Sequence, residues 1–270
     1  MPDAPTIPLA IFGAAGRMGQ RLVALAADDA TWKLVAAVDR PGHPRLGDDA
    51  GVLAGVKAQQ VALTDAMPAA ANPKVVIDFS HAGALAATLD AAARARAAVV
   101  IGTTGLGPEH QAALDRVAVD LPVIQATNFS LVVNVLNKLA ADAARLLGSD
   151  YDIEVLEAHH RFKKDAPSGT ALTLARVLCE ATGRDFDRDV RLHRHGDDAP
   201  RQPHEITVQT LRIGDHPGEH TAYFAALGER LEIRHVSTSR DSYVVGALRA
   251  AKWLAPRQPG RYTMRDVLGL

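Results

Sequence analysis

Short aliphatic runs alternate with alanine-rich amphipathic stretches through the first 125 residues, and this alternation constrains the fold more than any other feature. The runs predict strands at Leu9–Phe12, Leu34–Val38, Val75–Asp78, Val99–Ile101 and Val123–Gln125. The stretches between them predict helices at Arg17–Ala27, Ala82–Ala95 and Pro108–Ala118. Because strands and helices alternate along the chain, a parallel sheet with helices on both faces is favoured.

The pattern changes after Ser130 and predicts a second domain with a different layout. A helix, a strand and another helix are expected at Leu131–Leu147, Asp152–Ala158 and Ser168–Thr182. Alternating polar and apolar residues then predict strands at Ile206–Leu211, His220–Ala225 and Leu231–Val236. Short turns at Gly214-Asp215 and Gly228-Glu229 favour a mostly antiparallel or mixed sheet. A final helix, Tyr243–Leu254, is expected to return to the first domain, with a binding site between the two domains.

Composition excludes several classes of protein. The 30 basic and 31 acidic side chains give no general attraction to nucleic acid or to an acidic membrane surface. The single cysteine, Cys179, cannot form an internal disulfide, which favours a reducing compartment. Met1–Ala10 has no Lys or Arg before its apolar stretch, and no apolar run approaches the roughly 20 residues of a membrane span. We expect a cytoplasmic protein with no nucleic-acid or membrane partner.

A glycine-rich turn lies where the first strand passes into the first helix, and its sequence is Gly13-Ala14-Ala15-Gly16-Arg17-Met18-Gly19. Residues without side chains let the backbone approach a pyrophosphate, whose charge meets the N–H groups of the helix start. Asp39, which ends the second strand, suits a pair of ribose hydroxyls, and Arg40 suits a 2′-phosphate. NADH and NADPH therefore both stay open as cofactors. The alternative is a glycine turn kept only for close packing of strand against helix.

Two more segments follow predicted strands at the same edge of the sheet, Gly102-Thr103-Thr104-Gly105 and Ala126-Thr127-Asn128-Phe129. Ligands of open parallel sheets bind outside the carboxyl ends of the strands. Small and hydroxylated residues there would let the nicotinamide half of a cofactor lie against the backbone. Ordinary turns are the alternative for both segments.

Positive charge is concentrated at His159–Lys164, which carries two imidazoles, a guanidinium and two ammonium groups. Ser168 is a good N-cap, after which Gly169 and Thr170 open a helix with free N–H groups. Cations beside a helix start favour a pocket for carboxylates or phosphates, and a solvated basic loop is the alternative. No metal site is expected at His159-His160, because neighbours on an extended segment face opposite ways and the surrounding charge repels a cation.

Together these residues resemble the 4-hydroxy-tetrahydrodipicolinate reductase family, also called dihydrodipicolinate reductase, of lysine and diaminopimelate biosynthesis. The similarity runs in family order over nearly the whole chain. Its most specific part is Glu157–Thr170, with the sequence EAHHRFKKDAPSGT. The other matching stretches are GAAGRMG at Gly13–Gly19, VIDFS at Val76–Ser80, IGTTG at Ile101–Gly105, NFS at Asn128–Ser130, GEHT at Gly218–Thr221, GERLEI at Gly228–Ile233 and MRDVL at Met264–Leu268.

The resemblance implies an α/β fold, with a Rossmann-type parallel-sheet domain and an α+β domain with a mixed sheet. Residues 1–130 and 240–270 would bind the dinucleotide, and residues 131–239 would bind substrate and assemble a homotetramer. His159 and Lys163 fall on catalytic positions of the family, and His160, Gly169 and Thr170 on substrate positions. The implied cofactor residues are Gly13, Ala14, Ala15, Gly16, Arg17, Met18, Asp39, Arg40, Gly102, Thr103, Thr104, Ala126, Thr127, Asn128 and Phe129.

The implied reaction is the reduction of 4-hydroxy-tetrahydrodipicolinate, a small cyclic dicarboxylate, to tetrahydrodipicolinate with NADH or NADPH. Hydride would add at ring C4 and a proton at C3, with Lys163 as proton donor and His159 as a second donor or orienting group. His160 and the Gly169-Thr170 helix start would hold a carboxylate. Another amino-acid-pathway NAD(P) dehydrogenase and a non-catalytic NAD(P)-sensing module are the alternatives.

One segment departs from the family. Many relatives carry the pattern R-x-x-G-x-I-G-F, whereas this chain has Arg201-Gln-Pro-His204-Glu-Ile206-Thr207-Val208 and lacks both glycines. An altered loop geometry is expected there. Of the 11 histidines, only His159 and His160 are assigned a function; His220 is expected as a structural neighbour, and His193, His195, His204 and His216 are expected in solvent.

Overall fold

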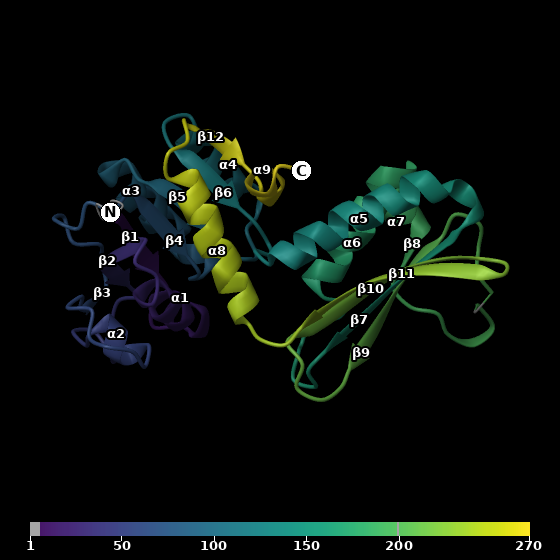
Figure 1. The fold of residues 1–270 in the computed structure, drawn as a ribbon, viewed down its shortest axis with the longest axis horizontal. Helices are drawn as coiled ribbons and strands as arrows, with labels where there is room; N and C mark the ends of the chain where they lie inside the picture. Colours follow the sequence, from purple (N-terminus) through teal and green to yellow (C-terminus); the bar gives the residue numbers. More distant parts are fainter. Residues whose placement is uncertain (1–5, 199) are drawn as a thin grey trace. The chain divides into compact units, whose positions relative to one another are not determined.

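The chain forms two compact units, drawn in Figure 1 from a computed structural model. The structure describes residues 6–198 and 200–270. The first five residues of Met1–Ala10, the segment considered above as a secretory signal, lie outside the described residues. One unit comprises the described part of Met1–Leu131 together with Asp241–Leu270, and the other comprises Val132–Arg240. Among the described residues, no helix is long and apolar enough to cross a membrane.

The first unit contains a seven-stranded sheet in which every pair of neighbouring strands is parallel. This confirms the predicted Rossmann-like architecture, and all five predicted strands are present. Two short edge strands, β3 and β12, were not predicted. In spatial order the strands are β12 (Gly260–Tyr262), β6 (Pro122–Gln125), β5 (Ala98–Ile101), β4 (Val75–Asp78), β1 (Ile7–Phe12), β2 (Trp32–Val38) and β3 (Leu63–Thr64).

Helices cover both faces of this sheet, as the alternation predicts. Leu9 and Ile11 of β1 pack into one core with α1 and α8, and Ala10 and Phe12 pack into another with α3 and α4. Successive residues of one strand thus enter opposite cores, which is why β1 is apolar throughout. The helical segments of this unit are α1 (Arg17–Ala27), α2 (Ala50–Leu53), η1 (Ala82–Ala84), α3 (Leu85–Ala95), α4 (Pro108–Ala118), α8 (Asp241–Leu254) and α9 (Met264–Leu268).

The second unit contains a five-stranded mixed sheet, in the order β11-β10-β7-β9-β8. The mixed sheet was predicted, but the turn at Gly214-Asp215 does not make β9 and β10 neighbours. β7 lies between them, parallel to β9 and antiparallel to β10. The elements are α5 (Leu131–Leu147), η2 (Gly148–Asp150), β7 (Asp152–His159), α6 (Gly169–Thr182), α7 (Phe186–Asp189), β8 (Val190–Arg191), η3 (Gly196–Asp198), β9 (Ile206–Arg212), β10 (Gly218–Ala226) and β11 (Glu229–Ser237).

One face of the second sheet packs against α5 and α6. Ile153 and Val155 of β7 join residues of both helices in a single buried cluster. Because side chains alternate along a strand, Glu157 and His159 point to this same face. The aliphatic core therefore gives way to two buried polar side chains at the carboxyl end of β7.

Candidate active site

The glycine turn after β1 has no room for side chains. Gly13 has φ +74°, and a Cβ on it would lie 2.7 Å from the carbonyl oxygen of Phe79. A Cβ on Gly19 would lie 2.0 Å from the Gly13 oxygen. Gly16 is the N-cap of α1 and provides no side-chain hydrogen bond to the helix start. The turn thus leaves bare backbone at a helix N-terminus, the arrangement that binds a pyrophosphate.

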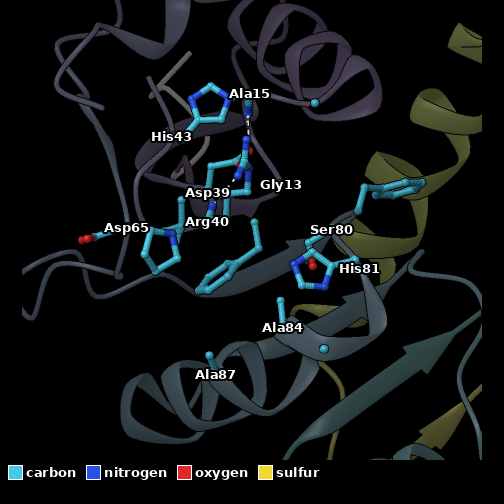
Figure 2. Close-up of a pocket in the computed structure, with 16 residues that line it drawn as sticks. Gly13, Ala15, Asp39, Arg40, His43, Asp65, Ser80, His81, Ala84 and Ala87 are labelled. Carbon is cyan, nitrogen blue, oxygen red and sulfur yellow. Dashed lines mark hydrogen bonds between the residues drawn. The ribbon is translucent and has the colours of Figure 1, made fainter. Parts of the chain in front are cut away.

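A cavity of about 550 Å³ lies beside this turn (Figure 2). Asp39 borders it with both carboxylate oxygens anchored by backbone, since Oδ2 accepts from the Ala15 N–H at 2.9 Å and Oδ1 from the Arg40 N–H at 2.8 Å. The cavity is lined by Phe12, Gly13, Ala15, Gly16, Val38, Asp39, Arg40, Pro41, His43, Asp65, Phe79, Ser80, His81, Gly83, Ala84 and Ala87.

Five of the predicted cofactor residues line this cavity: Gly13, Ala15, Gly16, Asp39 and Arg40. Ala14 is buried in the core instead, and neither Arg17 nor Met18 is a lining residue. Sequence reasoning did not assign His43, Asp65 and Ser80–Ala87 to a site. Ser80 lay within a stretch that resembles the family, but nothing in the sequence indicates that the segments after β2, β3 and β4 converge on one cavity.

The carboxyl ends of β4, β5 and β6 pack tightly together. Asp78, wholly buried, accepts hydrogen bonds through Oδ1 from the Ser80 N–H at 2.7 Å and from Thr103 Oγ1 at 3.1 Å. A Cβ on Gly102 would lie 2.4 Å from the Phe79 ring, whose centroid is 5.8 Å from that of Phe129. These contacts bring the two predicted nicotinamide segments side by side.

Within those segments, the side chains divide into buried and exposed ones. Thr103 and Phe129 are buried, so their side chains fix the segments from beneath. Thr104 and Thr127 are exposed, and the Asn128 side chain accepts a hydrogen bond from the Ser130 N–H at 2.8 Å. The exposed backbone and hydroxyl groups form the outer surface of this sheet edge.

In the second unit, Glu157 is wholly buried and accepts hydrogen bonds from several donors. His159 Nδ1 lies 2.5 Å from Oε2, and the Ser168 N–H donates to Oε1 at 3.0 Å. The guanidinium of Arg212 donates to both oxygens at 3.0 Å. Burial raises the pKa of Glu157, but hydrogen bonds from His159, Arg212 and Ser168 outweigh it and bring the pKa to about 2. The carboxylate is therefore ionised at neutral pH.

His159 lies among close neighbours on its other sides. A Cβ on Gly218 would lie 2.7 Å from His159 Nε2, so only glycine fits opposite this ring. The His220 ring meets the His159 ring edge-on, with centroids 5.3 Å apart, and His220 Nε2 lies 3.2 Å from Ser168 Oγ. Burial, followed by interaction with the neighbouring His159 and His235 rings, lowers the pKa of His220 to about 3, so this ring is neutral at pH 7.

The predicted basic loop places Lys163 beside Asp165, with Nζ 2.9 Å from Oδ1. This ion pair lowers the pKa of Asp165. The His160 backbone N–H donates to the carbonyl oxygen of His216, and burial followed by the charge of Arg240 lowers the pKa of the His160 ring. His216 is half-buried rather than in solvent as predicted, because the segment after β9 packs against this loop.

The start of α6 completes the substrate side. Ser168 is the N-cap, as predicted, and its Oγ accepts from the Ala171 N–H at 3.2 Å. Gly169 faces open space, since a Cβ there would meet no atom within 4 Å. Five predicted residues, His159, His160, Lys163, Gly169 and Thr170, thus come from one strand end, one loop and one helix start. Among the described residues, no group of three or more His, Cys, Asp or Glu is arranged to hold a metal ion.

The segment that departs from the family pattern keeps a backbone suited to glycine. His204 stands at the first missing glycine and has φ +66°. Thr207 stands at the second; it is buried, and its hydroxyl donates to Glu205 and accepts from Arg194. Arg201 also forms ion pairs with Asp152 and Glu154. The expected change in the loop is therefore a strained residue and an ionic cluster around the buried Glu205, rather than a rearranged strand.

Comparison with known proteins assigns the chain to a family. The family model described as "Dihydrodipicolinate reductase, N-terminus" matches residues 7–129, and "Dihydrodipicolinate reductase, C-terminus" matches residues 132–268. The 4-hydroxy-tetrahydrodipicolinate reductase of Myxococcus xanthus is 48% identical over 96% of each chain. That of Trichlorobacter lovleyi is 45% identical over 98% of this chain and 99% of its own.

A solved structure shares the fold. The dipicolinate-bound dihydrodipicolinate reductase from Paenisporosarcina sp. TG-14 superimposes with a TM-score of 0.76 at 22% identity, over 97% of this chain and 99% of its own. The two family models together cover nearly the whole sequence, and the two curated relatives cover 96% and 98% of it. The chain belongs to the dihydrodipicolinate reductase family.

Proposed function

We propose that this protein reduces 4-hydroxy-tetrahydrodipicolinate to tetrahydrodipicolinate with NADH or NADPH, in lysine and diaminopimelate biosynthesis. The single observation that carries the proposal is the second-unit site, where the buried Glu157–His159 pair adjoins Lys163 and the start of α6. A ring with two carboxylates needs this combination of cations and helix N–H groups. The Paenisporosarcina relative has dipicolinate bound, which is a molecule of that class.

The first unit fits a nicotinamide cofactor, because the glycine turn has no room for a Cβ at Gly13 or Gly19 and leaves bare backbone beside the cavity that Gly13 and Gly16 line. We assign the pyrophosphate to Gly13–Met18 and the adenine ribose to Asp39 and Arg40. Gly102–Thr104 and Ala126–Phe129 would hold the nicotinamide half. When bound there, a reduced nicotinamide would supply the hydride for ring C4. Asp39 suits a free 2′-hydroxyl and the exposed Arg40 a 2′-phosphate, so the residues suit either NADH or NADPH.

Lys163 is assigned as the proton donor at C3. Its ammonium group is held 2.9 Å from Asp165, which orients it. His159 presents Nε2 beside the reacting ring, because Nδ1 is engaged by Glu157. His160 and the N–H groups at Gly169 and Thr170 neutralise and orient a substrate carboxylate. Proton donation of this kind contributes roughly 10²–10⁴-fold to the rate.

We further propose that the first unit binds the dinucleotide, and that the second binds substrate and assembles a cytoplasmic homotetramer through its sheet. Leu211 of β9 and Val236 of β11 support the assembly, since they are 42% and 48% exposed on the face that α5 and α6 leave bare. Sedimentation of the purified protein measures the oligomeric state directly. Leu211→Glu should lower that state, and a wild-type monomer would refute the proposed assembly.

The test of the activity is the absorbance of NADH or NADPH mixed with the protein and freshly formed 4-hydroxy-tetrahydrodipicolinate. Loss of absorbance that requires both substrate and protein is expected with each cofactor. Cofactor binding without turnover would instead identify a sensing module. Turnover of an amino-acid semialdehyde in place of the cyclic dicarboxylate would identify another dehydrogenase of amino-acid metabolism.

A further inference from the structure

Three parts of the proposed substrate site converge on one ion pair, whose carboxylate is buried and whose guanidinium is half-buried. Glu157 lies in β7 and Arg212 at the end of β9, and each Arg212 Nη donates to a different Glu157 oxygen at 3.0 Å. The parallel register of the two strands places Arg212 opposite His159 rather than opposite Glu157. The guanidinium therefore reaches back along the sheet to form a two-pronged contact, the strongest geometry for this pair of groups.

The carboxylate of the pair makes two contacts that matter for the site. Oε2 engages His159 Nδ1 at 2.5 Å, and Oε1 accepts from the backbone N–H of Ser168 at 3.0 Å. One side chain thus holds both the imidazole and the first residue of the helix start. Thr210 Oγ1 also donates to Oε1, at 3.1 Å. It therefore binds the oxygen that Ser168 uses and not the oxygen that engages His159.

The guanidinium of the pair makes a third contact. Arg212 Nη2 donates to the backbone carbonyl oxygen of Asp165 at 2.6 Å. Asp165 is the residue whose carboxylate holds the Lys163 ammonium group. The ion pair is therefore joined to the basic loop as well as to the strand end and the helix.

We propose that the Glu157–Arg212 ion pair is a positioning element of the active site, in which Glu157 fixes His159 with its Nδ1 proton toward the carboxylate and Nε2 toward the substrate. This inference rests on the proposed function, since it names the residues through which His159 and Lys163 act. Neither Glu157 nor Arg212 is assigned to contact the substrate.

A carboxylate is required here for a physical reason. A neutral imidazole carries one N–H, and a carboxylate that accepts from Nδ1 leaves Nε2 as the free nitrogen. An amide at position 157 offers both an oxygen and an NH₂ group, so it would allow either tautomer. It would also remove the negative charge that stabilises a protonated ring, while the Arg212 charge would remain half-buried without its partner.

The decisive variant is Glu157→Gln, which conserves size and packing. We expect kcat to fall on the order of 10²-fold, within the range that one proton donor contributes. The KM for substrate should change less than the kcat, and the affinity for NADH, measured without substrate, should not change. Nitrogen-15 NMR of the His159 ring should show protonated Nδ1 in the wild type and a mixture of tautomers in the variant.

Thr210→Val is the matched control, because it removes a donor to the same carboxylate without touching His159. Its kcat should stay within about threefold of wild type, since a single neutral hydrogen bond contributes little. If Glu157→Gln does not fold, Arg212→Lys serves in its place. It keeps the charge but loses the two-pronged contact, and a smaller fall in kcat is expected.

A double-mutant comparison separates positioning from general stability. In a His159→Ala background, Glu157→Gln or Arg212→Lys should lower kcat little further. The effects of substitutions at residues that act as a unit do not add. Fully additive losses, or a Glu157→Gln protein with wild-type kcat and an unchanged His159 spectrum, would overturn the inference. Failure of the wild-type protein to reduce the dicarboxylate would refute the proposed function instead, and the NMR comparison would still report on Glu157.

Discussion

Gly246 of α8 touches Phe129 so closely that a Cβ on the glycine would lie 1.8 Å from the Phe129 carbonyl oxygen. Phe129 ends a predicted nicotinamide segment, and its ring packs against Phe79. A helix from the C-terminal part of the chain thus forms the wall against which this segment rests. The contact is between backbones, so no rotation of a side chain can relieve a larger residue there.

Gly246→Ala should therefore destabilise the first unit by about 1–3 kcal/mol, the usual cost of overpacking. Chemical denaturation measures the change, and the affinity for NADH should fall with it because the Phe129 segment must move. Gly169→Ala is the control for stability, since a Cβ at that position meets no atom within 4 Å. Equal stability of the two variants would contradict the close contact.

Lys163→Ala and His159→Ala should each lower kcat by roughly 10²–10⁴-fold, because each removes a proposed proton donor or its partner. Binding of NADH, followed by fluorescence, should be unaffected in both variants. Lys164→Ala provides the comparison, because Lys164 is exposed one position away. Wild-type turnover in the Lys163 variant would refute its assignment.

Asp39→Ala should raise the ratio of kcat/KM for NADPH to that for NADH by about tenfold, equivalent to roughly 1.4 kcal/mol. The carboxylate borders the cavity and its charge disfavours a 2′-phosphate, whereas a ribose diol benefits from it. Steady-state kinetics with both cofactors measure the ratio. A ratio that does not change would place the adenine ribose elsewhere.

His204→Gly should stabilise the protein by about 0.5–1 kcal/mol, because the left-handed backbone costs a residue with a side chain more than it costs glycine. The φ of His204 is +66°. The midpoint temperature of thermal unfolding should rise by about 2–3 °C. His195 lies before η3 in the same connection between β8 and β9 and lacks this backbone conformation, so His195→Gly should give no gain. An equal gain in stability from both variants would contradict the strain at His204.

Stability should fall between pH 7 and pH 5 because of His220. Burial first, and neighbouring histidines next, lower its pKa from 6.5 to about 3, so the unfolded chain takes up a proton that the folded chain does not. The unfolded state is favoured as pH falls below 6.5, by about 2 kcal/mol at pH 5. The pKa of Glu157 is lowered from 4.5 to about 2 in the folded protein. Its contribution to stability is therefore lost only as the pH falls below about 4.5.

Urea unfolding of wild type and His220→Asn at both pH values measures this difference. Asn cannot titrate, so the variant should lose about 2 kcal/mol less than wild type between pH 7 and pH 5. His235, whose pKa burial also lowers, contributes to both proteins and cancels in the comparison. Parallel losses in the two proteins would show that His220 titrates normally when folded.

Most of the first unit could be predicted from the sequence because its signals are local. Buried strands such as β4 are aliphatic throughout, and the helix starting at Pro108 begins with a residue suited to its first turn. The edge strand β12 was missed because Gly260–Tyr262 is only three residues long, with an exposed arginine at its centre. So short a run carries no periodicity to detect.

The site was harder to predict where residues meet across the sheet. The Glu157–Thr170 stretch carried its own signal, since its members are close in sequence. Arg212 carried none and His220 was expected only as a structural neighbour, because their places beside Glu157 depend on β7 lying between β9 and β10. Short turns suggest that consecutive strands pair; β10 and β11 do pair, but β9 and β10 do not. Strand order of this kind is set by packing between distant segments.

The discontinuity of the first unit has a consequence for synthesis on the ribosome. Val244, Ala247 and Leu254 of α8 are buried in the same core as Leu9 and Ile11 of β1. That core cannot close until the last 30 residues, from Asp241 onward, have left the exit tunnel, whereas every strand of the second sheet precedes them. The inserted unit therefore completes its folding first, while one face of the nascent N-terminal sheet is covered by α1 but still lacks α8.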